Sequence, residues 1–218
     1  MVEPVRIVGA GRVGSAFAAR LRERGVALRD GGAELVLICV PDGAIGEVAR
    51  GIEPGPWIGH VSGATLLSAL DPHRRRFSLH PLQTFTRARG PGQLDGAYAA
   101  VTAESEEARA VAVELAETLG LLPFRLADEE RALYHAGAAI ASNFLVTLRR
   151  VAGQLVEDAG APPEALDPLM RRTIENGFEL TGPIARGDWA TVEAHIRAIR
   201  ARRPEYEPLY QALAEVTS

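Results

Sequence analysis

The sequence contains no lysine, so all 24 of its basic side chains are arginine. Arginine stays protonated at any working pH, and it is therefore a poor proton donor and a poor Schiff-base former. Chemistry that depends on a lysine amine is excluded. A proton that a reaction needs must come from another kind of side chain, and the chain offers five histidines.

Cysteine, long apolar runs and an excess of positive charge are also missing. The single Cys39 cannot form an internal disulfide, and its place inside LVLICV predicts a buried strand position. No apolar run approaches the roughly 20 residues of a membrane span. The net charge of −4 gives no support for a nucleic-acid partner, which normally needs a basic face. The first expected strand begins almost at the first residue, which leaves no room for a signal peptide, and we expect a cytoplasmic protein.

What remains is the composition of an ordinary globular protein, with 47% hydrophobic and 24% charged residues. Its 218 residues are enough for one large domain or two small ones. Strand-like runs occur at 5–8, 33–40, 56–62, 74–81, 96–103 and 122–126, and helix-like runs at 15–25, 42–52 and 105–120. This alternation predicts a mostly parallel sheet covered by helices.

Three glycines near the start fit the pattern G-x-G-x-x-G. Gly9, Gly11 and Gly14 follow the expected strand 5–8 and precede the expected helix 15–25, which is the context in which this pattern binds a dinucleotide. Gly9 and Gly11 permit a tight turn and a close backbone approach, and Gly14 lets the helix pack on the sheet. The helix N-terminus favours a phosphate.

The segment that follows is too short for a complete dinucleotide-binding fold. Asp30, 21 residues after Gly9, lies where an acidic residue usually holds the ribose. Only residues 31–33 separate Asp30 from the next strand, whereas a parallel crossover needs about a dozen residues. We therefore expect VALRD (26–30) to be an edge excursion or a loop, so that the usual second strand and helix are absent.

Six stretches together resemble a known group of proteins: GAGRVGSAF, LVLICVPDGAI, HVSGA, SLHPLQTF, YHAGAAIASNF and LTGPIARGD. In order, and over nearly the whole chain, they resemble Rossmann-like proteins of unknown function that are often described as NADP oxidoreductases. That family is similar in architecture to pyrroline-5-carboxylate reductase, ketopantoate reductase and prephenate dehydrogenase. The resemblance implies an N-terminal nucleotide-binding domain and a helical C-terminal domain that often forms dimers. NADP is the implied cofactor, with NAD as the alternative.

The expected fold is α/β, a shortened Rossmann-like sheet followed by an all-helical C-terminal domain. From Asp128 onward the pattern is entirely helical, with one long helix over 128–160 and others around 163–180, 188–202 and 204–216. We expect a dinucleotide-binding domain at 1–127 and a helical substrate or dimerisation domain at 128–218.

The residues expected to bind the cofactor lie in the glycine loop and at the carboxyl ends of the next two strands, where ligands sit in open α/β sheets. They are Gly9, Ala10, Gly11, Arg12, Val13, Gly14, Val40, Pro41, Ser62 and Gly63. Two of them have alternatives, because Arg12 could be a solvated loop arginine and Ser62 a helix N-cap. Asp42 is expected to cap the following helix.

Hydride transfer to a carbonyl or imine needs a proton donor, and His80 and His135 are the candidates in a chain without lysine. Asn143 and Ser62 are expected to assist as orienting donors. His135 lies about two helical turns before Ser142, and it could equally be a buried structural histidine. The other histidines receive no catalytic role, and the sequence shows no convincing metal-ligand cluster.

Substrate contacts are expected from polar residues on loops and on the long helix: Gln83, Thr84, Ser142, Thr181 and Arg186. Thr181 and Arg186 suit an anionic substrate, although helix capping and a surface arginine explain them equally well. Tyr134 is expected to be a packing residue, and His73 is expected to be exposed.

Two functions fit these residues. The first is an NAD(P)-dependent oxidoreductase, a homodimer acting on a small carbonyl, imine or hydroxy compound. The second is a non-catalytic nucleotide-binding sensor or partner-binding dimer, which the shortened adenosine side suggests.

Overall fold

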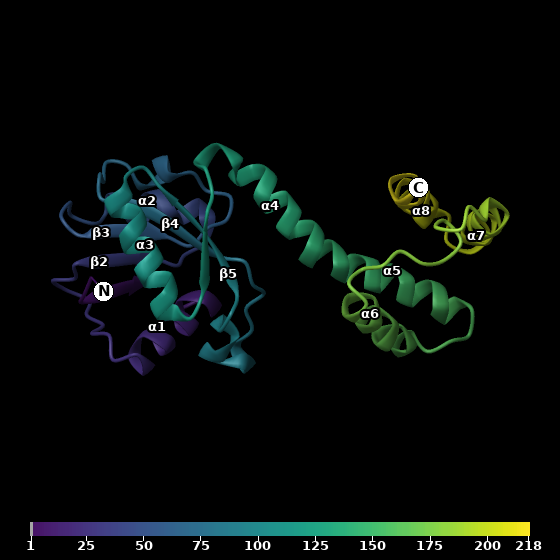
Figure 1. Ribbon diagram of the computed structural model, residues 1–218, viewed down its shortest axis with the longest axis horizontal. Helices are drawn as coiled ribbons and strands as arrows, with labels where there is room; N and C mark the ends of the chain where they lie inside the picture. Colours follow the sequence, from purple (N-terminus) through teal and green to yellow (C-terminus); the bar gives the residue numbers. More distant parts are fainter. Residues whose placement is uncertain (1) are drawn as a thin grey trace. The chain divides into compact units, whose positions relative to one another are not determined.

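The structure, a computed structural model, describes residues 2–218 and divides into two compact units (Figure 1). The first unit ends at Ala139, and the second extends from Ile140 to Ser218. The division lies inside the helical segment that begins at Asp128, so the first turns of that segment belong to the unit that holds the sheet.

In the described chain the first unit contains one six-stranded sheet, in the order β1-β2-β3-β4-β5-β6. The strands are β1 (Val5–Val8), β2 (Leu35–Ile38), β3 (Trp57–His60), β4 (Arg76–Pro81), β5 (Tyr98–Ala103) and β6 (Leu122–Arg125). Neighbouring strands are parallel except β4 and β5, which are antiparallel. The expected mostly parallel sheet is confirmed. It could be recognised because strands buried on both faces, such as β2, are continuous apolar runs.

Helices cover both faces of this sheet. They are α1 (Arg12–Glu23), α2 (Ile45–Arg50), α3 (Glu106–Leu119) and α4 (Arg131–Ala139). Successive strand residues point to opposite faces, so neighbours in β2 join different clusters. Leu37 packs in the large cluster that includes Phe17 of α1 and Leu115 of α3, whereas Ile38 packs with Ile45 of α2.

The sheet edge beside β1 differs from a complete dinucleotide-binding fold. Segment 26–30 forms no strand, and its Leu28 makes only an isolated parallel bridge with Val5. The Val5 N–H donates to the Ala27 carbonyl at 2.8 Å, and the Arg29 N–H donates to the Val5 carbonyl at 3.0 Å. The expected edge excursion is confirmed, and β1, α1 and β2 form one βαβ unit without the usual second strand and helix.

The second unit is helical. It contains a π-helical segment (Ile140–Phe144) and the helices α5 (Leu145–Asp158), α6 (Leu166–Glu175), α7 (Trp189–Arg202) and α8 (Glu207–Thr217). The expected long helix over 128–160 is present as a continuous helical run over 128–158, and it contains one π turn that the sequence did not indicate. A π turn holds an extra residue, which shifts the helical register and which apolar periodicity does not reveal.

The end of α6 and the start of α7 can be compared with the helix boundaries that the sequence predicted. Helix α6 ends at Glu175, earlier than expected, and Phe178 after it has a φ of +62°. Asp188 is the N-cap of α7, as expected, and its carboxylate accepts the Thr191 N–H at 3.2 Å.

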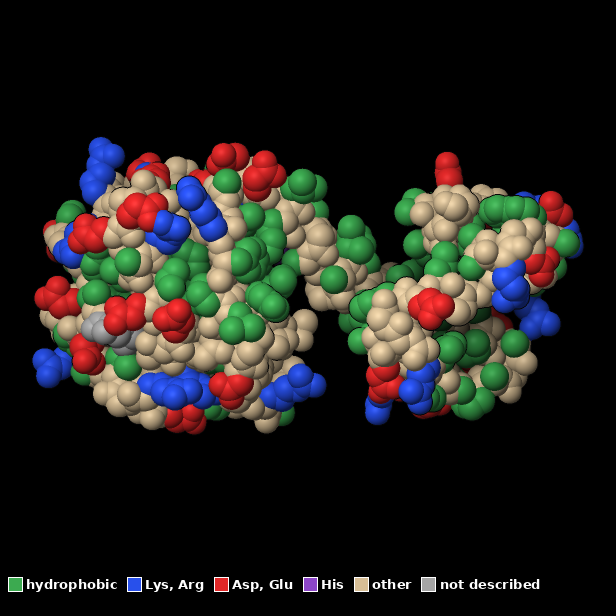
Figure 2. All heavy atoms as spheres, viewed as in Figure 1, with side chains coloured by type: hydrophobic (Ala, Val, Ile, Leu, Met, Phe, Trp, Pro, Cys, Tyr) green, Lys and Arg blue, Asp and Glu red, His purple; other side chains and the backbone are tan. Residues whose placement is uncertain are grey.

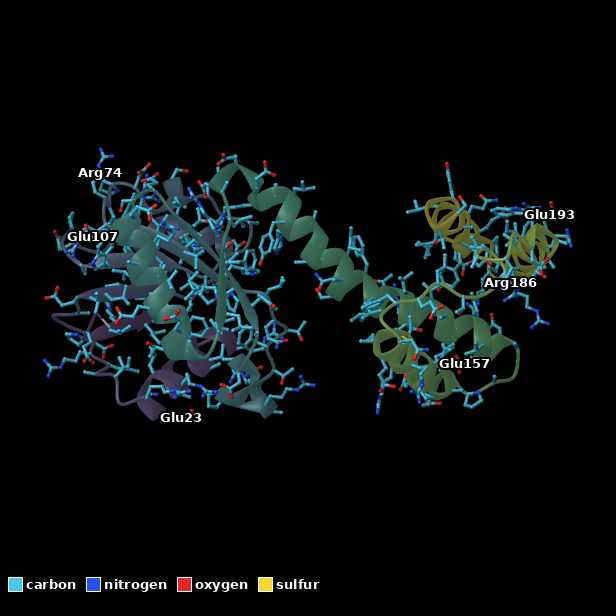
Figure 3. The ribbon with its side chains drawn as sticks, viewed as in Figure 1. Glu23, Arg74, Glu107, Glu157, Arg186 and Glu193 are labelled. Atoms are coloured by element: carbon cyan, nitrogen blue, oxygen red, sulfur yellow. The ribbon has the colours of Figure 1, made fainter. Side chains whose placement is uncertain are left out.

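Large apolar side chains remain on the surface of the second unit (Figure 2). Val146 is 72% exposed and Phe178 is 70% exposed. Charged side chains, including Glu157 of α5 and Glu193 of α7, project from other parts of its surface (Figure 3). Several large exposed apolar side chains on one unit are typical of a surface that contacts a partner.

Candidate functional site

In the glycine loop between β1 and α1, the first and third glycines lie too close to other backbone atoms for any side chain. Gly9 has a φ of +114°, and a Cβ there would lie 2.4 Å from the Cys39 carbonyl oxygen. A Cβ on Gly14 would lie 2.0 Å from the Gly9 carbonyl oxygen, so α1 approaches the loop as only glycine allows.

Gly11 is the opposite case, because no atom lies within 4 Å of the position of its missing Cβ. Gly11 is also the N-cap of α1 and supplies no side-chain acceptor to the first N–H groups of that helix. The space outside Gly11 therefore meets free N–H donors and the positive end of the helix dipole. Such a place suits an anion.

A cavity of about 450 Å³ lies beside the loop, on the side of the missing strand. Its lining is Val5, Ile7, Gly9, Ala10, Gly14, Ser15, Ala18, Arg22, Leu28, Arg29 and Asp30. Arg22 and Arg29 have no ion-pair partner within 4 Å in the described chain. A smaller cavity of about 260 Å³ lies between α1 and the 86–93 loop, where Arg12 faces Thr86 and Arg87.

Polar residues form a row across one face of the sheet, where apolar side chains would otherwise pack. His60 of β3 pairs with Ser78 of β4, and Ser78 pairs with Thr102 of β5. All three are at most 3% exposed. Buried polar groups need partners, and this row therefore requires a polar group opposite it.

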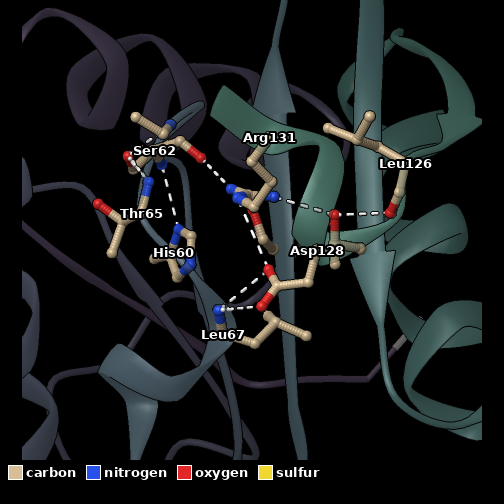
Figure 4. Close-up of polar contacts among 10 residues, drawn as sticks. His60, Ser62, Thr65, Leu67, Leu126, Asp128 and Arg131 are labelled. Carbon is tan, nitrogen blue, oxygen red and sulfur yellow. Dashed lines mark hydrogen bonds and ion pairs between the residues drawn. The ribbon is translucent and has the colours of Figure 1, made fainter. Parts of the chain in front are cut away.

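Arg131, the first residue of α4, supplies that group (Figure 4). It is fully buried, and its guanidinium donates to Thr102 Oγ1 at 2.9 Å and to Ser78 Oγ at 2.7 Å. It also donates to the Ser62 carbonyl oxygen. The carboxylate of Asp128 lies 3.8 Å from Arg131 Nε and accepts the Leu67 N–H at 3.1 Å. Arg131 thus joins α4 to β4, to β5 and to the turn after β3.

This buried charge acts on the neighbouring histidines. Burial, together with the positive charge of Arg131 and that of His80 where it is protonated, lowers the pKa of His60 to about 3. Burial lowers the pKa of His80 to about 4, with His135 and Arg131 adding to the effect and the Asp42 carboxylate opposing it. Both imidazoles are therefore neutral at neutral pH.

His80 and His135 meet above Gly63. A Cβ on Gly63 would lie 2.9 Å from His80 Nε2 and 2.7 Å from His135 Cδ2, so only glycine leaves room for both rings. The two ring centroids are 6.1 Å apart. His80 Nδ1 lies 2.8 Å from the hydroxyl oxygen of Tyr134. The structure thus brings together the two histidines that the sequence indicated as proton donors, and His135 is exposed rather than buried.

Ser62 acts as a cap, whereas Asp42, which was expected to cap a helix, does not. Ser62 is buried, and its Oγ accepts the Thr65 N–H at 3.0 Å, so its side chain caps the local turn. Asp42 does not cap a helix, contrary to expectation, because the short 3₁₀ turn begins at Asp42 itself with Pro41 as its N-cap. Its exposed carboxylate instead acts on His80 and Arg131 through space.

The expected substrate-contact residues lie in separate places. Gln83 and Thr84 are exposed on the loop after β4, where Gln83 Nε2 donates to the Gln93 carbonyl at 3.2 Å. Four polar candidates belong to the second unit, where two are in the π-helical segment and two are between α6 and α7: Ser142, Asn143, Thr181 and Arg186.

Three residues of the site were not found from the sequence as functional. Tyr134 was expected to pack, yet it contacts His80, and neither Arg131 nor His60 was assigned a role. His73 was expected to be exposed and is 3% exposed, because its Nε2 bonds the Ala49 carbonyl at 2.9 Å. Its charged neighbours concealed this burial.

Residues 2–218 hold no group of three or more His, Cys, Asp or Glu side chains that could bind a metal ion. Within the same residues, every helix is too short or too polar to cross a membrane. Cys39 is buried, and burial raises the pKa of its thiol to about 12.

The sequence matches a known protein family. Residues 97–217, more than half of the chain, match the family described as a domain of unknown function, DUF2520. The chain belongs to the DUF2520 family. The resemblance to Rossmann-like proteins of unknown function is confirmed. Among curated proteins, by contrast, no match is found.

Solved structures share the fold over nearly the full length of this DUF2520 protein. A protein of Bacteroides fragilis, described as a proposed NADP oxidoreductase, is 22% identical with a TM-score of 0.79, covering 98% of this chain and 97% of its own. A Thermotoga maritima protein is 24% identical with a TM-score of 0.81, covering 98% and 96%. The 1-pyrroline-5-carboxylate reductase of Streptococcus pyogenes is 13% identical with a TM-score of 0.62, covering 98% and 95%. At these identities the likeness shows the fold.

Proposed function

We propose that this DUF2520 protein is an NAD(P)-dependent oxidoreductase that transfers a hydride to or from a small carbonyl, imine or hydroxy compound. The geometry of the glycine loop carries the proposal. Gly9 and Gly14 are closed by backbone contacts, whereas Gly11 opens to free space at the N-terminus of α1. A dinucleotide pyrophosphate needs this combination of close backbone approach and free N–H groups.

The residues around the loop fit the rest of such a cofactor. The 450 Å³ cavity would hold the adenosine, and Val40, Pro41, Ser62 and Gly63 follow the ends of β2 and β3, where a nicotinamide would lie. When bound, the nicotinamide supplies or accepts the hydride. Arg12, exposed at the first turn of α1, would contact a phosphate.

His80 and His135 are the proposed acid–base groups. They face each other above Gly63, at the carboxyl end of β3 and the same end of the sheet as the glycine loop. A reduced carbonyl or imine gains a proton on its oxygen or nitrogen, and a nearby imidazole can supply it. The Ser62 hydroxyl caps the local turn, so in this proposal it positions Gly63 and does not orient the substrate. Asn143, which the sequence predicted as an orienting donor, belongs to the second unit and is given no role in this proposal.

NADP(H) is the proposed form of the cofactor. Arg22 and Arg29 line the adenosine cavity without an ion-pair partner in the described chain, and arginine suits a 2′-phosphate. Asp30 lines the same cavity and would favour the free ribose hydroxyls of NAD(H). The two arginines give the cavity a net positive charge, which favours the 2′-phosphate of NADP(H).

Calorimetric titration with NADPH, NADH and ADP-ribose tests the proposal, with the variants Gly11→Val and Gly51→Val. We expect micromolar binding that weakens by at least about tenfold in Gly11→Val, or ~1.4 kcal/mol. Gly51 is the matched control, because it caps the far end of α2 and a Cβ there makes only ordinary contacts.

The outcomes separate the candidate functions. Binding that Gly11→Val removes supports cofactor binding at the glycine loop. Turnover on a panel of small carbonyl and imine compounds then supports the oxidoreductase. Binding without turnover on that panel favours the nucleotide-binding sensor, which the missing adenosine wall suggests. No binding of any of the three ligands contradicts the proposed cofactor.

A further inference from the structure

His80 has one hydrogen-bond partner in the described chain, the hydroxyl of Tyr134. Its Nδ1 lies 2.8 Å from that oxygen, and the two rings meet edge to face with centroids 5.5 Å apart. The other nitrogen, Nε2, has no partner among residues 2–218, and its edge of the ring lies over Gly63. The contact with Tyr134 therefore decides which nitrogen of His80 carries the proton.

Both side chains are neutral near pH 7. Burial raises the pKa of Tyr134 to about 12, and it lowers the pKa of His80 to about 4. The charged and titratable groups near His80 are His135, Tyr134 and Arg131 on α4, Asp42 after β2 and His60 at the end of β3. The imidazole thus carries a single proton, on Nδ1 or on Nε2.

The hydrogen bond favours one of these tautomers. A phenol hydroxyl is a more acidic donor than the N–H of a neutral imidazole, and a ring nitrogen is a good acceptor. If Nδ1 carried the proton, the Tyr134 hydroxyl hydrogen would have no acceptor in the described chain. If Tyr134 donates to Nδ1, both the phenol proton and the Nδ1 lone pair are satisfied.

We propose that Tyr134 is a positioning residue, whose hydroxyl donates to Nδ1 of His80 and thereby fixes the imidazole proton on Nε2, over Gly63. This inference deepens the proposed function and rests on it for its catalytic meaning. His80 then presents a neutral N–H donor that suits the oxygen of a carbonyl or hydroxy substrate. The second imidazole of the site, that of His135, is exposed, and its ring centroid lies 6.1 Å from that of His80.

Long-range ¹H–¹⁵N correlation spectra of the ¹⁵N-labelled protein without cofactor test the inference, because nitrogen shifts report which ring nitrogen is protonated. A His80→Gln variant assigns the signals. We expect His80 of the wild-type protein to carry its proton on Nε2. In Tyr134→Phe the ratio of the two tautomers should move toward Nδ1–H by about fivefold, the factor for a hydrogen bond of ordinary net strength.

The chain contains a matched control. Tyr210 makes the same kind of contact in the second unit, with its hydroxyl 2.8 Å from His195 Nδ1. Tyr210→Phe should shift the His195 signals and leave those of His80 unchanged.

A wild-type His80 protonated on Nδ1 would overturn the inference, and so would an unchanged tautomer ratio in a folded Tyr134→Phe. The wild-type spectrum alone decides the first point, even where the variant does not fold. The spectra need no cofactor, so their result is independent of whether NADPH binds.

Discussion

At the scale of single residues, His60 is a fully buried ionisable group of the site. Its Nδ1 accepts the Ser62 N–H at 3.2 Å, which leaves the ring proton on Nε2. That Nε2 is buried without a hydrogen-bond partner of good geometry among residues 2–218, and the Leu66 backbone only partly opposes the fall in the pKa of the ring. Protonating Nδ1 would break the bond to Ser62 and place a second positive charge near Arg131.

The free energy of unfolding should therefore fall as the pH is lowered from 7 to 5. His60 has a pKa near 6.5 when unfolded and about 3 when folded, so in this interval only the unfolded chain takes up its proton. The linkage removes about 2 kcal/mol of stability between pH 7 and pH 5. Urea denaturation at both pH values measures the loss, and His60→Gln should reduce it by that amount. An equal loss in both proteins would refute the assignment.

Sequence reasoning found residues whose position in an element is informative. His80 could be identified as a candidate because it lies at a strand end, where ligands bind in α/β sheets, and His135 because it lies on the long helix about two turns before Ser142. Tyr134 could not be assigned to His80, because the two are 54 residues apart and meet only in the folded chain. His73 shows the opposite error, since three charged neighbours made a buried histidine look exposed.

At the scale of elements, the beginning of α4 is held to the sheet by polar contacts. The buried Arg131 guanidinium bonds groups from β4, β5 and the turn after β3, and it lies near the Asp128 carboxylate. Removing this side chain would leave Ser78, Thr102 and the Ser62 carbonyl without their donor.

Arg131→Met should therefore lower the free energy of unfolding by about 3–5 kcal/mol, the cost of breaking a buried charged network. Chemical denaturation measures the difference. Arg150→Met is the control, because Arg150 is an exposed arginine of α5, and we expect a change below about 0.5 kcal/mol. A loss below 1 kcal/mol in Arg131→Met would contradict the role given to this residue.

Elements with strong local signals were predictable, and those set by register were not. Helix α3 is capped at its start by Ser105, whose Oγ accepts the Ala108 N–H at 3.1 Å, and at its end by Gly120 with a φ of +86°, so both of its ends are visible in the sequence. The π-helical segment Ile140–Phe144 has no such signal, because one extra residue in a turn leaves the local composition unchanged.

At the scale of the whole molecule, the exposed apolar side chains of the second unit support the proposed homodimer. We expect the wild-type protein to have the mass of a dimer, because Val146 and its exposed apolar neighbours would lose solvent contact there. Val146→Glu should shift the mass toward the monomer in light scattering after gel filtration.

Leu122→Glu changes an exposed leucine of β6 in the first unit and serves as the control, with no expected change in mass. A wild-type protein with the mass of a monomer would contradict the dimer. A dimer that survives Val146→Glu would place the interface elsewhere.

The single bridge between Leu28 and Val5 has one more consequence. Backbone groups alternate in direction along a strand, and Val5 points to the bridge while Val8 points to β2. Ile7 therefore turns its N–H and C=O toward the cavity that it lines, where a full second strand would have paired them. These two groups are main-chain atoms, and no choice of side chain encodes them. Related chains can exchange the side chains around this cavity and still keep the same donor and acceptor, so this part of the binding surface leaves no trace in a sequence motif.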